Sequence, residues 1–228
     1  MTRVNLEDFM TDFAAARRNM VDGQVRTADV TDLRIIAAMQ AIPRERFLEP
    51  AMAGLAYLDL DVPVGEGGRG GRRMIKPMVL ARLIQAVDLS PTDHVLDLGC
   101  ATGYAAAVLA QVAGNVVALE EDEALYAAAR ANLAGQANVT VVSGRLTAGW
   151  AQAGPYDAIV VEGAVEAAPE GLFEQLKDGG RLVCVLGGGP AAKAMIYSRS
   201  RAQTSGRPLF DAAAPVLPGF SKLSEFSF

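Results

Sequence analysis

A short loop rich in small residues, from Asp97 to Tyr104, is the part of the sequence whose residue types and spacing could do chemistry. It lies between a strand-like and a helix-like run, and in an open α/β sheet ligands bind at the carboxyl ends of the strands. Small residues there let backbone N–H groups and the helix N-terminus approach a ligand. A dinucleotide fingerprint requires glycines at relative positions 0, 2 and 5, which here are Gly99, Ala101 and Tyr104. Tyr fits the last of these positions poorly. The loop therefore gives little support to a nicotinamide-dependent oxidoreductase, which remains only a weak alternative.

The same loop matches a second pattern, in which an acidic residue, a glycine, a small residue and a glycine occupy every second position. This pattern is typical of S-adenosylmethionine-dependent methyltransferases, whose loop accommodates a nucleoside with an amino-acid tail and no pyrophosphate. Glycine after a strand is also ordinary turn chemistry. We predict S-adenosyl-L-methionine as cofactor and S-adenosylhomocysteine as product, bound by the loop residues Asp97, Gly99, Cys100, Ala101 and Gly103.

A carboxylate at the end of the next strand-like run supports this interpretation. Glu120 lies where a carboxylate can accept two hydrogen bonds from a ribose diol. Glu121 and Asp122 open a helix-like segment, where acidic residues need no functional explanation because they complement the helix dipole. We therefore predict that Glu120 binds the ribose of the cofactor.

The elements that must position these residues alternate between strand-like and helix-like runs. Strand-like runs cover residues 95–98, 115–119, 139–142, 157–161 and 181–186, and helix-like segments cover 105–112, 121–133 and 169–176. This rhythm predicts an α/β fold with a doubly wound, mainly parallel sheet of the Rossmann-like methyltransferase type, covered on both faces. Residues 194–198 and 209–228 are predicted to form antiparallel strands at one edge of that sheet.

The N-terminal part of the chain is predicted to be helical. Apolar residues recur there at the spacing of one helical face, first at Leu6, Phe9, Met10 and Phe13 and then at Leu33, Ile36 and Met39. A glycine-rich, cationic stretch at 65–71 follows, and Pro77 begins a further helix. We predict an N-terminal helical segment over residues 1–76 and a cofactor-binding core over residues 77–228, within one structural domain overall.

Composition excludes several classes of protein. The chain has 228 residues, of which 51% are hydrophobic and 21% charged, so a buried core is expected and a disordered chain is not. Its net charge of −5 argues against a nucleic-acid partner. The single His94 is predicted to be structural, which disfavours a Ser-His-Asp or Cys-His hydrolase. Cys100 and Cys184 lie apart in apolar or glycine-rich surroundings and are predicted to be core residues, with neither a disulfide nor a metal site.

The sequence also gives an expectation about location. Residues 1–10 contain two acidic side chains and no apolar core, so they do not resemble a secretory signal. The longest apolar stretch, 105–119, is interrupted by polar residues and glycine and is too short to span a bilayer. We expect a soluble, cytoplasmic protein without a membrane partner.

Several segments together point to one family. They are residues 19–21, 24–26, 38–39, 42–47, 56–57, 95–99, 103–110, 149–150, 155–159 and 175–183. The most diagnostic are Pro-Arg-Glu-Arg-Phe at 43–47 and Gly-Trp at 149–150, ahead of Pro-Tyr-Asp at 155–157. With this set the chain resembles the protein-L-isoaspartate O-methyltransferase family over most of its length.

The resemblance implies a reaction and a partner. Members of that family methylate the carboxylate of isoaspartyl residues, which starts the repair of damaged proteins, so the implied partner is a protein or peptide with isoaspartyl residues. The carboxylate is already ionised near neutral pH, and the displacement from a sulfonium cation therefore requires no strong base. Alignment of the reactants and exclusion of water can supply roughly 7–11 kcal/mol.

The chain departs from the family at the substrate motif. Where the family has Gln-Thr-Ile-Ser-Gln-Pro, whose Ser is associated with the substrate site, this chain has Arg72 to Pro77, with Ile75 in place of the Ser. We predict that Arg73, Ile75 and Lys76 form the catalytic, substrate-facing segment, in which the basic groups of Arg72, Arg73 and Lys76 could hold an acidic substrate. The alternatives are a solvated surface loop, and a paralogue that methylates another acidic or hydroxyl substrate or acts as a regulator without turnover.

Two further departures lie near the cofactor. The family usually has Gly-Asp-Gly after the third strand, with the acid available to the adenine amino group, and this chain has Gly144 and Arg145 followed by Leu146. We assign Gly144 and Arg145 to the cofactor site on this resemblance, although an arginine only donates hydrogen bonds and could instead turn outward. Glu162, near the end of the fourth strand, could repel a carboxylate substrate or pair with a nearby basic residue, Arg73 or Lys76.

Overall fold

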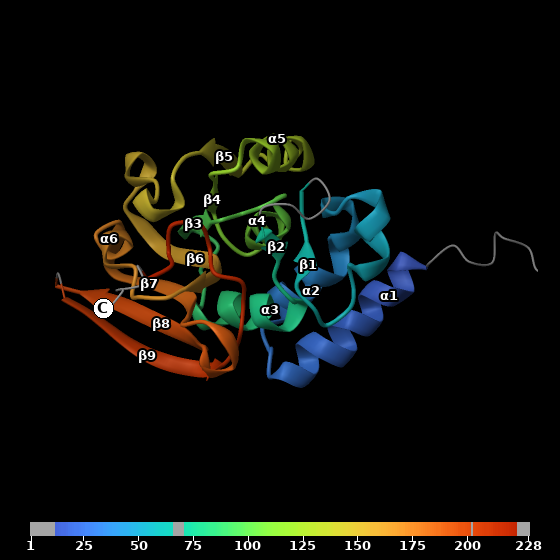
Figure 1. Cartoon of the computed structure of the whole chain (residues 1–228), viewed down its shortest axis with the longest axis horizontal. Coiled ribbons are helices and arrows are strands. Elements are labelled where there is room, and N and C mark those ends of the chain that lie inside the picture. Colours follow the sequence, from blue (N-terminus) through green and yellow to red (C-terminus); the bar gives the residue numbers. More distant parts are fainter. Residues whose placement is uncertain (1–11, 66–70, 202, 223–228) are drawn as a thin grey trace, which may run out of the picture.

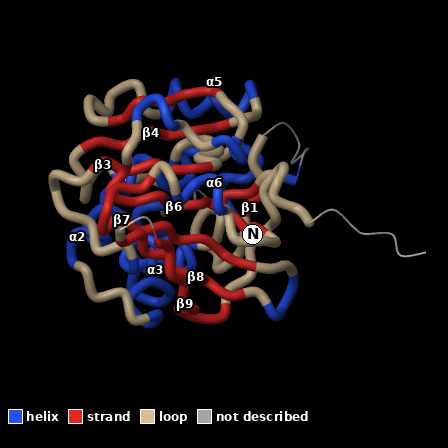
Figure 2. Tube along the Cα trace, turned by 90° about the vertical axis from the view of Figure 1, so that its left-hand side faces the viewer, coloured by secondary structure: helices blue, strands red, loops and turns tan. Residues whose placement is uncertain are grey.

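The protein is built around a seven-stranded sheet with the strand order β5-β4-β3-β6-β7-β8-β9. The computed structural model describes residues 12–65, 71–201 and 203–222. Figure 1 shows the sheet running through the middle of the molecule, and Figure 2 shows its strands one above the other from β4 to β9. The strands are β3 (His94–Leu98), β4 (Asn115–Glu120), β5 (Val139–Ser143), β6 (Tyr156–Val165), β7 (Leu176–Leu186), β8 (Lys193–Ser200) and β9 (Gln203–Asp211).

Strand direction divides this sheet in two. The pairs β3–β4, β4–β5, β3–β6 and β6–β7 are parallel, and the pairs β7–β8 and β8–β9 are antiparallel. The chain builds outward from β3 through β4 to β5 and then returns to place β6 on the other side of β3. The strand order therefore reverses between β3 and β6, and such a switch point is where open α/β sheets bind ligands.

Helices and short turns precede and connect these strands. The α-helices are α1 (Phe13–Met20), α2 (Leu33–Ala41), α3 (Pro77–Ala86), α4 (Tyr104–Leu109), α5 (Glu123–Asn132) and α6 (Glu170–Phe173). The shorter turns are η2 (Val21–Val25), η3 (Arg26–Ala28), η4 (Arg44–Phe47), η5 (Pro50–Leu55), η7 (Leu146–Ala148), η8 (Ala151–Ala153) and η9 (Gly189–Ala191). A separate antiparallel ribbon pairs β1 (Val62–Pro63) with β2 (Arg73–Met74).

Local sequence explains where the main helices begin. The side chain of Asp32 accepts a hydrogen bond from the N–H of Arg34 at the start of α2, and Asp122 accepts two from the first turn of α5. Such side-chain caps satisfy N–H groups that have no partner within the helix. Pro77 occupies the first position of α3, where its missing N–H costs nothing. The interpretation of Asp122 as a helix-opening residue is thus confirmed.

Two buried apolar clusters cover the two faces of the sheet. On β3, Val95 belongs to the cluster shared with α2 to α5, whereas Leu96 and Leu98 belong to the one shared with α6. The first cluster extends from Met20 in α1 to Ala212, so the N-terminal helices and the sheet share one core. The predicted α/β fold, covered on both faces, is confirmed, while the division at residue 76 stays a prediction.

Two expectations about the ends of the chain need correction. Among the described residues the last strand is β9, which includes residues 209–211 of the predicted strand. Residues 212–222 form only an isolated bridge between Val216 and Ala164. Pro215 and Pro218 in this segment lack the N–H that a continuous ladder needs.

The second correction concerns Leu33, which was predicted to lie on a buried helical face. Leu33 is 71% exposed because it is the first residue of α2 and lies off the buried face that holds Ile36 and Met39. The predicted helical face at residues 6–10 and the C-terminal residues 223–228 lie outside the described residues.

Within the described ranges, no helix combines the length and the apolar character needed to cross a bilayer.

Candidate active site

The glycine-rich loop joins β3 to α4 at the carboxyl end of the parallel strands. Gly99, Ala101 and Gly103 have φ angles of 80°, 50° and 96°, in the left-handed region that favours glycine. The N–H of Gly99 donates to the carbonyl of Leu119 at 2.9 Å, which holds the loop against the end of β4. A Cβ on Gly103 would lie 2.6 Å from the Cδ1 of Leu133, so a side chain there would collide with the end of α5. The loop spacing thus produces a tight turn packed against its neighbours.

Glu120, the last residue of β4, is fully buried beside this loop. Its carboxylate accepts hydrogen bonds from the backbone N–H groups of Ala101 at 2.8 Å, Glu121 at 2.9 Å and Asp122 at 3.1 Å. Arg72 donates to both carboxylate oxygens, with each nitrogen–oxygen distance 2.9 Å. The predicted ribose acceptor therefore has five N–H donors, and two of them belong to an arginine.

Arg72 lies between the β1–β2 ribbon and the loop, with a side chain only 6% exposed. Its carbonyl accepts a hydrogen bond from the N–H of Val64, and its Nη2 donates to the carbonyl of Gly99 at 2.9 Å. The guanidinium thus bridges the carboxylate at the end of β4 and the first turn of the loop. The prediction that Arg72 is available to an acidic substrate is wrong for this conformation, because the side chain is buried against Glu120.

Leu217 fills the space on the other side of the same loop. It is 4% exposed, and its N–H donates to the carbonyl of Ala164 while the N–H of Ala164 donates to Pro215. A Cβ on Gly99 would lie 3.3 Å from both methyl groups of Leu217, and one on Gly163 would lie 2.7 Å from its Cγ. The C-terminal segment thus brings an apolar side chain into the switch point between β3 and β6. The sequence analysis did not identify this residue.

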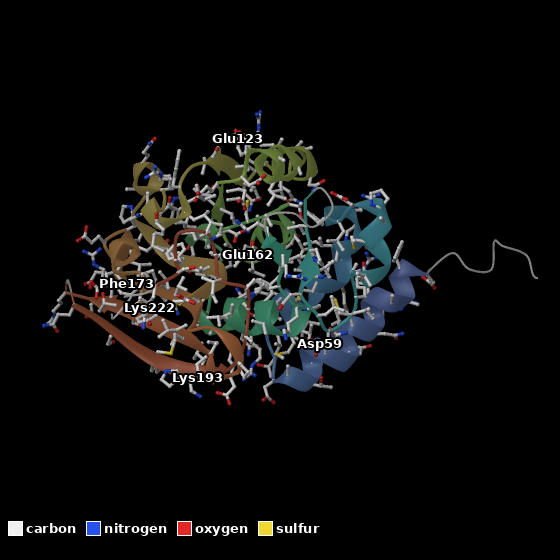
Figure 3. All side chains as sticks on the ribbon, in the orientation of Figure 1. Asp59, Glu123, Glu162, Phe173, Lys193 and Lys222 are labelled. Carbon is white, nitrogen blue, oxygen red and sulfur yellow. The ribbon has the colours of Figure 1, made fainter. Side chains whose placement is uncertain are left out.

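Asp97 and Glu162 form a buried pair of carboxyl groups on the adjacent strands β3 and β6. Both oxygens of Asp97 and Oε1 of Glu162 are buried without a hydrogen-bond partner among the described residues. Burial raises the pKa of Asp97 to about 7, and burial together with the Asp97 carboxylate raises the pKa of Glu162 well above its ordinary value. Burial beside Asp97 therefore favours the protonated form of Glu162. Figure 3 shows its place near the centre of the molecule.

The predicted substrate segment is divided between the surface and the core. Arg73 is exposed and donates to the carbonyl of Asp61, and Lys76 is half-buried with its backbone N–H bonded to the Asp61 carboxylate. Ile75 is 1% exposed, and its carbonyl accepts a hydrogen bond from the buried guanidinium of Arg44 at 2.7 Å. Neither Arg73 nor Lys76 pairs with the buried carboxyl group of Glu162 among the described contacts, and Ile75 faces the core rather than a substrate.

The residues assigned to the cofactor by resemblance lie at the end of β5. The N–H of Gly144 donates to the carbonyl of Glu120 at 3.0 Å, and a Cβ on Gly144 would lie 2.9 Å from the ring of Trp150. Arg145 is exposed, as in the outward-turned alternative. Cys100 in the glycine loop is 1% exposed, and burial raises the pKa of its thiol well above the ordinary value, so it is an inert core residue. Cys184 is likewise free and buried, as expected.

A pocket of about 270 Å³ opens at the end of β4. It is lined by Arg72, Glu120, Glu121, Asp122 and Pro218. The residue types around it fit a nucleoside cofactor, because a glycine loop and a carboxylate lie at the ends of neighbouring strands. Two side chains would have to move for a nucleoside to bind there, because Arg72 occupies the carboxylate of Glu120 and Leu217 packs against Gly99. Among the described residues no cluster of His, Cys, Asp and Glu could hold a metal ion.

Comparison with known proteins places this site in a family. Residues 16–209 match the family model described as protein-L-isoaspartate(D-aspartate) O-methyltransferase. Protein-L-isoaspartate O-methyltransferase 1 of Rhodopseudomonas palustris (strain HaA2) is 41% identical over 193 residues, 84% of this chain and 77% of the relative. The enzyme of the same name from Methylorubrum extorquens (strain PA1) is 43% identical over 177 residues, 77% of this chain and 76% of the relative.

Solved structures agree with this. A protein-L-isoaspartate O-methyltransferase with 27% identity has a TM-score of 0.77 and covers 89% of this chain, while the match spans 66% of that structure. A structure from Plasmodium falciparum in complex with S-adenosyl-L-homocysteine shares the fold, with a TM-score of 0.73 and 17% identity over 88% of this chain and 97% of that one. These matches confirm the family predicted from the sequence. The chain belongs to the protein-L-isoaspartate(D-aspartate) O-methyltransferase family of S-adenosylmethionine-dependent methyltransferases.

Proposed function

We propose that this protein transfers a methyl group from S-adenosyl-L-methionine to a carboxylate of a protein or peptide, with isoaspartyl residues as the first candidate. The observation that carries the proposal is the position of Glu120 and the glycine loop at the ends of β4 and β3, beside the point where the strand order reverses. Membership of the family supplies the substrate class.

In this reaction the protein supplies no general base, and its contribution is to position the reactants. An acceptor carboxylate is ionised near neutral pH and attacks without losing a proton, so the protein must align it and exclude water. The exposed Arg73 and the half-buried Lys76 are the cations of the predicted substrate segment that remain accessible to an acidic acceptor. Their roles, those of the predicted cofactor residues and a cytoplasmic location stay predictions.

A second candidate function is methylation of a different acceptor. Ile75 takes the place of a family hydroxyl and is buried, so no hydroxyl group is presented at that position. An aliphatic side chain cannot hydrogen-bond a peptide or carboxylate oxygen. This substitution favours a paralogue that keeps the cofactor and accepts another acidic or hydroxyl substrate.

One experiment separates the two. The protein is incubated with methyl-labelled cofactor and an isoaspartyl peptide, beside the same peptide with ordinary aspartate. Base-labile label on the isoaspartyl peptide alone is the result that the first proposal predicts. Label on neither peptide, while the protein binds S-adenosylhomocysteine, would refute isoaspartyl methylation and support the paralogue.

A further inference from the structure

The cofactor site predicted at the glycine loop and Glu120 is filled in this chain by two of its own side chains. Arg72 comes from the β1–β2 ribbon and Leu217 from the C-terminal segment, 145 residues further along the chain. Both reach the same glycine, since a Cβ on Gly99 would lie 3.3 Å from Nη2 of Arg72 and 3.3 Å from the methyl groups of Leu217. They therefore close one site from two sides.

On one side the site is blocked by the ion pair between Arg72 and Glu120. A carboxylate has about four lone-pair positions, and that of Glu120 already receives five N–H groups. Three of these are backbone groups fixed by the loop and by the start of α5. A hydroxyl pair that donates to Glu120 can therefore only replace the two hydrogen bonds from Arg72.

On the other side the site is blocked by Leu217, whose segment makes few hydrogen bonds to the sheet. Residues 212–222 form no strand ladder. The N–H of Ala164 donates to Pro215, the N–H of Leu217 to Ala164 and the N–H of Glu166 to the carbonyl of Phe220 at 2.9 Å. A fourth hydrogen bond to the end of β6 runs from the N–H of Lys222 to the Glu166 carboxylate. A segment with so few backbone bonds can separate from the sheet without disturbing the core strands. Leu217 can thus leave the glycine loop while β3, β4 and β6 stay in place.

We propose that Arg72 and Leu217 are internal competitors that set the cofactor affinity of this chain, and that the cofactor binds only when Arg72 leaves Glu120 and Leu217 leaves Gly99. The proposal rests on the proposed function for the identity of the ligand. It differs from a cofactor site that is open before binding, because the apparent affinity is reduced by the fraction of molecules in which the two side chains are in place.

The test is calorimetric titration of the full chain with S-adenosylhomocysteine. Leu217→Ala is expected to tighten binding by about ten-fold or more, because it removes the side chain that fills the site. Leu172→Ala is the matched control: it is the same truncation in the same buried cluster, but it lies on α6 outside residues 212–222, and its affinity should equal that of the wild type. Unchanged or weaker binding by Leu217→Ala would overturn the proposal.

Hydrogen exchange on the wild-type protein gives a second readout that requires no variant. Saturating S-adenosylhomocysteine should increase exchange at the amides of Ala164 and Leu217, because their hydrogen bonds to the carbonyls of Pro215 and Ala164 must open. Protection of these amides would contradict the proposal. If the wild type binds the ligand and Leu217→Ala changes nothing, the internal competition is refuted while the proposed function stands. If neither protein binds it, the cofactor assignment and the competition both fail.

Discussion

Replacing Arg72 by methionine tests the buried ion pair at the centre of the site. The two side chains are 6% and 0% exposed, and breaking a buried pair by removing one partner typically costs about 3–5 kcal/mol. Three backbone N–H groups continue to bind the Glu120 carboxylate, so we expect Arg72→Met to lower the free energy of unfolding by about 3 kcal/mol. Methionine keeps much of the apolar stem and therefore limits the loss of packing.

The assay is urea denaturation followed by the fluorescence of Trp150, the single tryptophan. The control is a double-mutant cycle with Glu120→Gln, because the amide that this variant places against the backbone N–H donors is present with and without Arg72 and cancels in the coupling energy. The coupling energy should be at least about 1 kcal/mol. A loss below about 1 kcal/mol in Arg72→Met, or a coupling energy near zero, would show that the pair is solvated and would refute the reasoning.

Two further predictions concern the neighbouring residues. Because the pKa of Asp97 is raised to about 7, the native state holds a proton that the unfolded chain releases near pH 4, so stability should fall as pH rises from about 4 to 7. Asp97→Asn should reduce this pH-dependent loss of stability and raise the free energy of unfolding at pH 8 by about 2 kcal/mol in urea titrations. A wild-type protein that is equally stable at pH 5 and pH 8 would contradict this prediction. Ile75→Ser should lower the free energy of unfolding by about 3 kcal/mol and leave isoaspartyl methylation no faster than in the wild type, since Ile75 lies in the core. A variant of unchanged stability that methylates the isoaspartyl peptide faster than the wild type would show that the side chain faces the substrate.

Local patterns predicted most of the fold. Apolar runs located the parallel strands, and Asp122 was interpreted as a helix-opening residue because an acidic side chain at that point has a local role. Glu120 was located from its position at the end of a strand-like run, and the structure places it there. In each case the residues that make up the sequence pattern are within a few positions of the residues that form the predicted feature.

The missed features depend on contacts between distant segments. Arg72 was grouped with Arg73 and Lys76 as a basic cluster, yet its partner Glu120 is 48 residues away and no local pattern encodes that contact. Ile75 was expected at the substrate because the family resemblance implies a substrate segment there, whereas packing places its side chain in the core.

Leu217 shows the same limit at the C-terminus. A composition rich in Pro, Ser and aromatic residues was interpreted as a strand over 209–228, but the prolines at 215 and 218 prevent a continuous ladder. Residues 212–222 instead cross the ends of β3 and β6 and place Leu217 on Gly99. This arrangement depends on tertiary packing alone. The prolines were the available signal that the strand would stop.

The most direct test of the account is a crystal structure of the protein grown with S-adenosylhomocysteine. We predict the ribose of the ligand on the Glu120 carboxylate, the guanidinium of Arg72 withdrawn from it, and Leu217 displaced from the glycine loop. Ligand bound elsewhere, with Arg72 still paired to Glu120, would contradict both the assignment of the site and the order of events proposed for it.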